Sequence, residues 1–382
     1  MLIRDVRSQD DITKLMQLIG VTDEGISYMR GKGVLRILQI DDLDTRGANI
    51  FKQESLAIGA DLALPRSAAG FQTEKVDAIL MANDKQIGKL ISKLKAQPFG
   101  LKDAAARLSK LIINYDKEDF KLVSPHGREL VLEQAVVMGV LNVTPDSFSD
   151  GGRFCSADKA VSCAKEMFSD GAAIIDIGGE STGPGSQDVS LDEELARVIP
   201  VITAVRKELP DVFISIDTCK FAVAQKAIEA GADMINDVTA GRNDMQILDM
   251  NVPIVLMYSK DDTPRTTKEN VQYDDVMRTI VTFLEGRIAV AKSKQIIVDP
   301  GMGAFVSGDP KYSFEILKKL AELKSLGLPI LVGASRKSFL GGEVSDRLES
   351  STSAAVLAVN NGAKIIRAHN VAATFKALNI FN

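Results

Sequence analysis

From residue 136 onward the chain repeats one pattern, in which a short Ile/Val-rich run is followed by polar residues and then by a longer amphipathic stretch. This alternation predicts strands and helices in βα order. The runs are almost continuously apolar, which indicates strands buried on both faces, as in a parallel sheet covered by helices. The eight runs are VVMGVLNV at 136, AIIDIGG at 173, FISID at 213, DMINDV at 233, PIVLMY at 253, QIIVDPG at 295, PILVGAS at 329 and AKIIRAH at 363.

Eight βα units within about 250 residues match a (β/α)8 TIM barrel in number and in length. A doubly wound parallel sheet is the competing architecture, but it normally has fewer strands and a G-x-G-x-x-G turn after its first strand. The segment NVTPDSFSDGG, which follows the first run here, lacks that spacing. We therefore predict an α/β fold with a TIM barrel over residues 135–382.

Residues 1–118 are expected to form a separate, smaller α/β domain of unknown role, followed by a charged linker or hairpin over residues 119–134. The segments VLRILQI at 34 and AILMA at 78 are typical of strands. Ile87, Leu90, Ile91 and Leu94 recur at helical spacing and predict one buried helix face. A further helix is predicted near residues 101–113. No catalytic constellation is recognisable in this region.

The composition excludes some classes of partner. The 382 residues include 46 basic and 51 acidic side chains, a net charge of −5, which gives no reason to expect nucleic acid or an anionic membrane as a partner. The first residues lack the apolar stretch of a signal peptide, and no run approaches a membrane span. The three cysteines, Cys155, Cys163 and Cys219, suggest neither disulfides nor a zinc site and fit a reducing compartment. We expect a cytoplasmic location.

Polar residues follow every predicted strand. Because barrel enzymes bind their ligands at the carboxyl ends of the strands, these residues are candidates for a site. One polar residue at a strand end is often a helix cap. Polar residues at every exit instead predict a crater in which Asp and Asn meet cationic side chains, suited to a ligand with hydrogen-bond donors on one edge and a multiply charged anion on another. The exits carry Asn142, Thr144 and Asp146; Asp176; Asp217; Asn236 and Asp237; Met257 and Tyr258; Asp299; Arg336, Lys337 and Ser338; and Arg367 and His369.

The segments GVLNVTPDSFSDGG, DIGGEST, SIDT, IND, VDPGMG, GASRKSF and RAHNV occur in the order of the motifs of the dihydropteroate synthases, in the pterin-binding barrel family. The resemblance covers roughly residues 134–382 and includes a motif for most barrel exits. It implies a transferase of folate biosynthesis that joins 7,8-dihydropterin-6-ylmethyl diphosphate to p-aminobenzoate and releases pyrophosphate. It also implies Mg2+ as cofactor and, more weakly, a homodimer.

The resemblance assigns a pterin pocket. Asp299 would accept hydrogen bonds from the exocyclic amine and ring N–H of the pterin, because a carboxylate forms paired, charge-assisted bonds with such an edge. Asn236 and Asp217 would complete the pocket, and Lys337 would donate to the acceptor side of the ring. Met257 would pack against the flat ring.

The resemblance also assigns the anionic and second-substrate regions. Asn142 would contact the diphosphate and its Mg2+, while Arg367 and His369 would bind phosphate oxygens. The benzoate would lie near Thr182 and Ser338. The Ser/Asp/Gly-rich residues after Asn142 would form a mobile loop over the reaction. The residues expected to act in catalysis are Asp217, Lys337 and Arg367.

Three positions depart from the family motifs. Gly183 stands where GGESTRPG has arginine, Asn370 stands where aspartate usually follows histidine, and Phe305 lies one residue later than the phenylalanine of GxGF. By the resemblance, the arginine of the motif is a fixed cation that helps to organise two mobile loops and the second substrate, and the three changes leave the pterin and diphosphate residues nearly intact. Two alternatives therefore remain: a non-catalytic paralogue that binds the pterin diphosphate, and a methyltetrahydrofolate:corrinoid methyltransferase, which binds a pterin in a similar barrel without needing diphosphate ligands.

Overall fold

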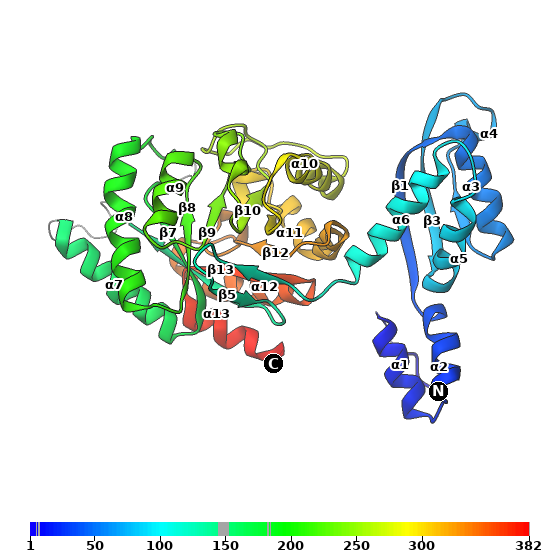
Figure 1. The fold of residues 1–382 in the computed structure, drawn as a ribbon, viewed down its shortest axis with the longest axis horizontal. Coiled ribbons are helices and arrows are strands. Elements are labelled where there is room, and N and C mark those ends of the chain that lie inside the picture. Colours follow the sequence, from blue (N-terminus) through cyan, green and yellow to red (C-terminus); the bar gives the residue numbers. More distant parts are fainter. Residues whose placement is uncertain (5, 7, 144–152, 182, 184, 382) are drawn as a thin grey trace. The chain divides into compact units, whose positions relative to one another are not determined.

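The computed structural model describes residues 1–382 apart from 5, 7, 144–152, 182, 184 and 382 (Figure 1). The chain divides into two compact units, Met1–Ile113 and Asn114–Asn382. Thr182 lies outside the described residues. The loop predicted after Asn142 does too, except for Val143 and the residues from Arg153 onward. Within the described residues, no helix is long and apolar enough to cross a membrane.

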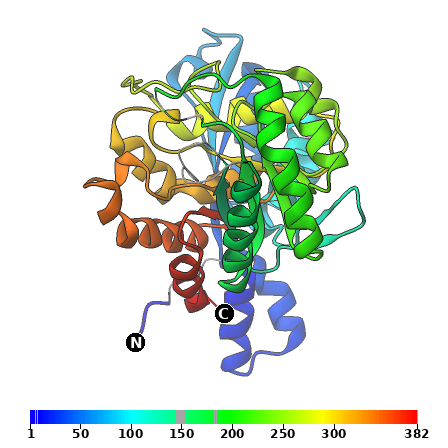
Figure 2. The same cartoon turned by 90° about the vertical axis from the view of Figure 1, so that its left-hand side faces the viewer.

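The second unit contains a closed barrel of eight parallel strands, as the sequence predicts, with helices around it (Figures 1 and 2). The strands are β6 (Val136–Asn142), β7 (Ala172–Gly178), β8 (Phe213–Asp217), β9 (Met234–Asp237), β10 (Ile254–Met257), β11 (Ile296–Asp299), β12 (Ile330–Val332) and β13 (Ala363–Ala368). The α-helices are α7 (Arg153–Ser169), α8 (Leu191–Glu208), α9 (Phe221–Glu229), α10 (Val276–Val290), α11 (Pro310–Lys319), α12 (Leu348–Asn360) and α13 (Val371–Leu378).

One connection departs from the predicted βα alternation. Between β9 and β10 the chain forms only the 3-10 helix η3 (Met245–Asp249). The carboxylate of Asp237 accepts hydrogen bonds from the Thr239 hydroxyl and from the backbone N–H groups of Thr239 and Gly241. Ala240 and Gly241 have positive φ values of 52° and 76°, which an α-helix excludes. Asp237 thus stabilises the turn that follows β9. This structural role accounts for the polar residue at the end of that strand, and no ligand is needed to explain it.

The almost continuous apolar runs arise because each strand is buried on two sides. One side chain from each strand points inward and joins a single buried cluster, while alternate side chains pack outward against the helices. The inward cluster, called the inner layer below, comprises Met138, Ile174, Phe213, Met234, Val255, Ile297, Leu331 and Ile365.

A short antiparallel hairpin closes the N-terminal end of the barrel. It is formed by β4 (Lys121–Val123) and β5 (Glu129–Val131), and Leu122 and Leu132 belong to the same buried cluster as the inner layer. Its loop is held by Asp233, which directly precedes β9. The carboxylate of Asp233 accepts from Ser124 Oγ at 2.6 Å and from Arg128 Nε at 2.8 Å, and also from Arg206 of α8. The segment 119–134 therefore packs as part of the barrel unit.

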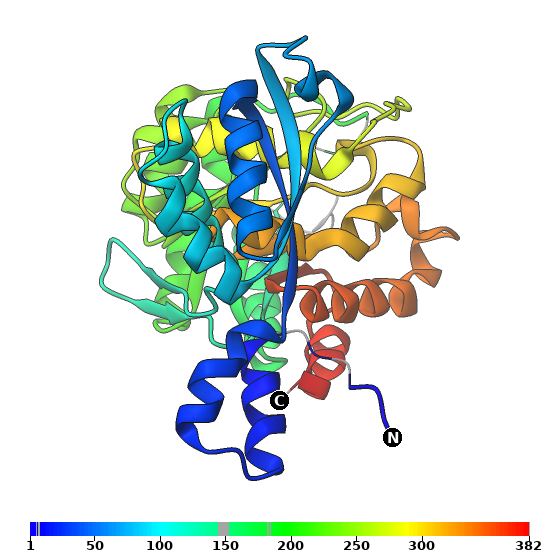
Figure 3. The same cartoon turned by 90° about the vertical axis from the view of Figure 1, so that its right-hand side faces the viewer.

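The first unit is a three-stranded sheet of order β1-β3-β2 with helices against it (Figure 3). The segments predicted as strands form β1 and β3, and those predicted as helices form α5 and α6. Asn83 and Gln86 form a capping box that begins α5, whose Ile87, Leu90 and Leu94 are buried. The elements are α1 (Gln9–Leu18), α2 (Asp23–Met29), η1 (Arg30–Lys32), β1 (Leu35–Asp44), α3 (Thr45–Ala57), β2 (Asp61–Ala63), α4 (Arg66–Ala69), β3 (Lys75–Asn83), α5 (Asp84–Leu94) and α6 (Leu101–Tyr115), which ends just inside the second unit.

Candidate functional site

Five of the eight residues in the layer directly above the inner layer are polar. Successive side chains of a strand point to opposite faces, so the residue two positions after an inner-layer residue also points into the barrel. This rule generates a second inward layer toward the C-terminal ends of the strands, where barrel enzymes bind ligands. The layer comprises Val140, Asp176, Ser215, Asn236, Met257, Asp299, Gly333 and Arg367.

Arg367 on β13 joins several members of this layer. Its Nε donates to Oδ2 of Asp176 at 2.6 Å, and its Nη2 donates to Oδ2 of Asp217 at 2.7 Å. The same oxygen of Asp176 accepts from Nδ2 of Asn236 at 3.1 Å. The guanidinium therefore spans carboxylates from β7 and β8. Three residues predicted from the sequence, Asp217, Asn236 and Arg367, are brought together, with Asp176 as the link.

Asp299 and Lys337 form the other side of the charged group. Oδ1 of Asp299 accepts from Gly301 N at 2.8 Å, which fixes the carboxyl group at the end of β11. Nζ of Lys337 donates to Met302 O at 3.1 Å and lies 4.9 Å from the centre of the Phe305 ring. Lys337 interacts electrostatically with Asp299, Arg367 and Asp217. The predicted cationic and anionic residues thus share one electrostatic environment.

Burial shifts the titration of these groups toward neutral pH. It raises the pKa of Asp217 to about 7 despite the opposing charge of Arg367, and raises the pKa of Asp299 to about 6 despite Lys337. Burial also lowers the pKa of Lys337 to about 8. Burial acts to lower the pKa of Arg367, but Asp176 and Asp217 outweigh it and raise that pKa, so Arg367 stays charged. Shifted groups that converge in one place are typical of a functional site.

Asn142 ends β6 with an exposed side chain close to this group. A Cβ atom added to Gly178 on the neighbouring strand would lie 3.4 Å from Cβ of Asp217 and 3.8 Å from Oδ1 of Asn142. The missing side chain at Gly178 therefore leaves room between Asn142 and Asp217. Met257 ends β10 beside Asp299 in register and is buried, so its thioether forms part of the apolar wall.

His369 and Ser338 lie after the last two strands. Nδ1 of His369 lies 3.1 Å from Ser335 Oγ. Burial, together with Arg367, Arg336 and Lys337, lowers the pKa of His369 to about 4, so its imidazole is neutral at pH 7 and offers an N–H rather than a charge. Asn370 does not serve as a partner to the imidazole but caps α13 by accepting from Ala373 N at 2.9 Å. Ser338 begins the 3-10 helix η6 (Ser338–Leu340) and is exposed.

Asp176 is named from the sequence at the second strand, but neither its position nor the family resemblance assigns it a role. It is fully buried, both of its hydrogen bonds are accepted by Oδ2, and Oδ1 has no partner among the described residues. Ser215, its register partner on β8, also has a buried Oγ without a described partner. The available signal was a charged residue inside an otherwise apolar strand, because a buried carboxylate is costly unless it is paired.

The described residues contain no group of three or more His, Cys, Asp or Glu side chains that could hold a metal ion. Asn142 offers one amide oxygen at the crater. Mg2+ keeps several waters and is usually bound by few protein oxygens together with substrate phosphates. A single amide oxygen therefore fits Mg2+ that arrives with a phosphorylated ligand.

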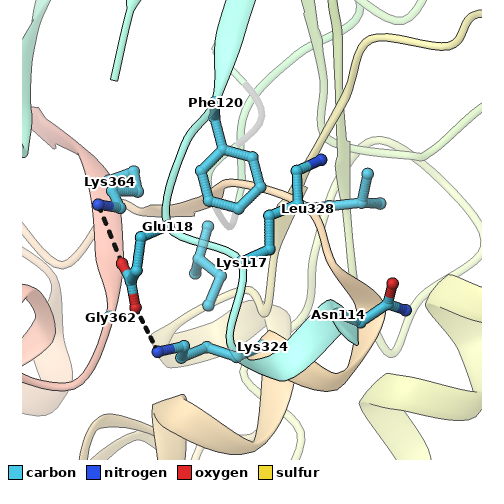
Figure 4. Close-up of a pocket in the computed structure, with 9 residues that line it drawn as sticks. Asn114, Lys117, Glu118, Phe120, Lys324, Leu328, Gly362 and Lys364 are labelled. Carbon is cyan, nitrogen blue, oxygen red and sulfur yellow. Dashed lines mark hydrogen bonds and ion pairs between the residues drawn. The ribbon is translucent and has the colours of Figure 1, made fainter. Parts of the chain in front are cut away.

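The opposite end of the barrel holds a pocket of different character (Figure 4). The carboxylate of Glu118 lies between Nζ of Lys324 at 2.5 Å and Nζ of Lys364 at 3.1 Å. Burial acts to raise the pKa of Glu118, but the two lysines outweigh it and lower that pKa. These groups satisfy one another and tie the segment after α6 to the starts of β12 and β13, which indicates a structural role.

Comparisons with known proteins match the second unit to one family. Residues 138–369 match the family described as pterin binding enzyme. A dihydropteroate synthase from Synechocystis is 42% identical over an alignment of 255 positions, which covers 63% of this chain and 87% of that protein. A solved structure of Xanthomonas albilineans dihydropteroate synthase with 4-aminobenzoic acid superposes with a TM-score of 0.62 at 38% identity, covering 68% of this chain and 96% of that chain.

A longer relative matches both units. A probable bifunctional folylpolyglutamate synthase/dihydropteroate synthase from Halobacterium salinarum is 38% identical over an alignment of 396 positions, gaps included, which covers 98% of this chain but only 46% of that protein. The chain thus spans about half the length of this relative. The match includes the first unit, which lies outside the region matched by the family profile.

Proposed function

The chain belongs to the family of pterin-binding enzymes, and we propose that it is a dihydropteroate synthase. In this reaction the amine of p-aminobenzoate attacks the methylene carbon of 7,8-dihydropterin-6-ylmethyl diphosphate. The new C–N bond replaces the C–O bond, pyrophosphate leaves and the amine loses one proton. The observation that carries the proposal is the group of buried carboxylates that meets Arg367 and Lys337 above the apolar inner layer.

The carboxyl groups suit a flat heterocycle with donors on one edge. Asp299 retains an oxygen that does not bond Gly301, and Asn236 carries an amide that can donate and accept. A bound pterin would pair with Asp299, and Met257 would pack against the ring. Lys337 would donate to the acceptor side of the heterocycle. Pairing inside a buried site strengthens each of these bonds.

Charge stabilisation is the main catalytic demand. Departure of pyrophosphate leaves positive charge on the reduced pterin, which the carboxylate of Asp217 would stabilise. Arg367 would bind the leaving phosphate oxygens from its fixed position between Asp176 and Asp217. The neutral His369 would add one N–H. The aromatic amine is unprotonated near pH 7, so the enzyme mainly has to position it.

Mg2+ is the proposed cofactor, with Asn142 as its protein ligand; when bound it neutralises charge on the diphosphate. The benzoate is proposed to lie near Ser338 and the loop that contains Thr182. We also propose a homodimer formed through the late helices, supported by the exposed side chains of Leu357 on α12 and Phe375 on α13. A cytoplasmic location is supported by the free cysteines, of which Cys219 has its pKa raised by burial to about 12.

A steady-state assay with both substrates and saturating Mg2+ tests the proposal. We expect pyrophosphate release that depends on p-aminobenzoate, and its absence would reject the synthase. Gly183 favours one alternative, a protein that binds the pterin diphosphate without turnover, because this loop lacks the motif's arginine. Calorimetry separates the two, since that alternative requires diphosphate-dependent pterin binding in a protein that forms no product.

A further inference from the structure

Arg265 connects two loops at the C-terminal end of the barrel. It lies in the segment between β10 and α10, and its guanidinium pairs with the carboxylates of Glu180 and Asp188. Its Nη2 also donates to Gln187 O at 3.0 Å. All three partners lie in the β7–α8 loop, residues 179–190, of which 182 and 184 lie outside the described residues. One side chain thus holds that loop at both of its ends.

Glu180 is the buried centre of this connection. Its side chain is only 6% exposed and pairs with both Arg265 and Lys220, which follows β8. Nζ of Lys220 also donates to Glu194 at 2.6 Å and to Val189 O at 2.8 Å. The Glu180 clamp, defined as Glu180, Arg265 and Lys220, therefore links the loops after β7, β8 and β10. A buried carboxylate is costly when it is left without a cation, so two cations ensure that Glu180 keeps a partner if one of them is removed.

The clamp bears on the most prominent departure from the family motif. A Cβ atom added to Gly183, where the motif has arginine, would lie 3.7 Å from Ser181 Oγ and would meet no closer atom among the described residues other than its chain neighbours, so a larger residue would fit there. The loop therefore obtains no cation from position 183. Arg265 reaches the same loop from a segment about 80 residues later in the chain.

We propose that Arg265 is a positioning residue that orders the β7–α8 loop for the second substrate and takes over the role of the arginine missing at position 183. This inference rests on the proposed function for the identity of that substrate. It predicts a selective effect, because Arg265 contacts none of Asp299, Asn236 or Lys337, which are assigned to the pterin. It also predicts that Arg265→Ala still folds, because Lys220 remains to neutralise Glu180.

The test compares Arg265→Ala, Arg265→Lys and a matched control. Asp262→Asn is the control, because it removes an ion pair of the same segment, with Arg242, that does not reach the β7–α8 loop. We expect Arg265→Ala to raise the KM for p-aminobenzoate about tenfold, the effect of losing one charged hydrogen-bonding group, with the KM for the pterin diphosphate and the melting temperature unchanged. Arg265→Lys should recover part of the loss. Equal changes in both KM values, or the same change in Asp262→Asn, would overturn the inference.

A second variant tests whether an arginine at position 183 can replace Arg265. Gly183→Arg in the Arg265→Ala background should lower the KM for p-aminobenzoate again, whereas no recovery would overturn the proposed substitution of one arginine for the other. Hydrogen exchange of residues 185–190 gives a readout without turnover: it should be faster in Arg265→Ala and unchanged in Asp262→Asn. If the wild type makes no product, the proposed function fails, while faster exchange would still support the clamp and unchanged exchange would reject it.

Discussion

Two fully buried aspartates lie toward opposite ends of the barrel, and they differ in how their oxygens are used. Asp233, at the N-terminal end, accepts four hydrogen bonds spread over both oxygens, from two arginines, a serine and a backbone N–H. Asp176, toward the C-terminal end, accepts two bonds on one oxygen, and its other oxygen has no described partner. Both are paired with arginine, so charge alone does not distinguish them.

The difference indicates which end is built for structure and which for a ligand. Most buried polar atoms in proteins are hydrogen-bonded, so a saturated carboxylate has no capacity left for another molecule, while an unused buried oxygen calls for an explanation. The pKa shifts of the acidic groups also differ between the two ends of the barrel. The lysines beside Glu118 lower its pKa, whereas burial raises the pKa values of Asp217 and Asp299 at the crater.

The largest expected effect is on stability at the N-terminal end. Asp233→Ala leaves two arginines and a backbone N–H without their acceptor, so we expect a loss of roughly 3–5 kcal/mol in the free energy of unfolding. Denaturant titration measures this loss. Turnover of the remaining folded protein should be unchanged. A loss of turnover without loss of stability would contradict the structural role.

Asp176→Asn should show the reverse pattern. The amide oxygen can still accept from Arg367 and Asn236, and one buried charge disappears, so unfolding should change by about 1 kcal/mol or less. We expect kcat/KM to fall by about 10- to 100-fold, because the charge that positions Arg367 is lost. Steady-state kinetics and thermal unfolding on the same preparation measure both quantities. If this variant unfolded as readily as Asp233→Ala and kept its turnover, the contrast between the two aspartates would be wrong.

The pH dependence of turnover sharpens the comparison at the crater. The proposed pterin contacts need Asp299 ionised and Lys337 protonated, and the pKa values of these groups are about 6 and about 8. We expect kcat/KM to fall below pH 6 and above pH 8, with protonation of Asp217 beginning near pH 7. A pH–rate profile that stayed flat from the acid to the alkaline side would contradict these assignments.

The same groups make the stability of the free protein depend on pH with a definite sign. The raised pKa values of Asp217 and Asp299 favour the folded state fully below their ordinary value of 3.8, and this contribution is lost as pH rises through about 6 and 7. The lowered pKa of Lys337 favours the folded state above its ordinary value of 10.5, and this contribution is lost as pH falls through about 8. All three groups therefore oppose folding near pH 7 until a ligand pairs with them.

The smallest effect is expected at Glu118. Its side chain is 55% exposed, so Glu118→Gln should lower the free energy of unfolding by less than about 1 kcal/mol. Salt should reduce the difference further, and chemical denaturation at low and high salt measures it. Turnover should not change. A large loss of turnover would show that the pocket at this end communicates with the crater.

The fold was predictable where a local pattern specifies it. The eight barrel strands and β1, β3, α5 and α6 follow from apolar runs and periodicity within each segment. The η3 connection was not predicted, because the bonds of Asp237 override the helical pattern after β9. Packing of Leu122 and Leu132 under the inner layer was also not predicted, because it depends on contacts across the whole barrel.

The site was predictable to the extent that strand ends are recognisable. Asp217, Asp299 and Arg367 stand at exits and were selected on that basis, and the structure brings them together. Asp176 lies inside its strand, so it is named with the polar strand-end residues but receives no role from the sequence. Arg265 and Glu180 are 85 positions apart in the sequence (265 − 180), and nothing in either segment specifies the pairing.

The hairpin beneath the barrel has a consequence for how this protein is divided into modules. Leu122 and Leu132 supply part of the buried floor, and Ser124 and Arg128 complete the bonding of Asp233. A fragment that begins at Val136 would lack Leu122 and Leu132, so the inner layer would be exposed to solvent, and Asp233 would lose the hydrogen bonds from Ser124 and Arg128. A fragment that begins at Asn114 keeps the leucines and the hydrogen bonds. Exchange of the barrel unit between relatives should therefore join the chains ahead of the hairpin rather than at the first barrel strand.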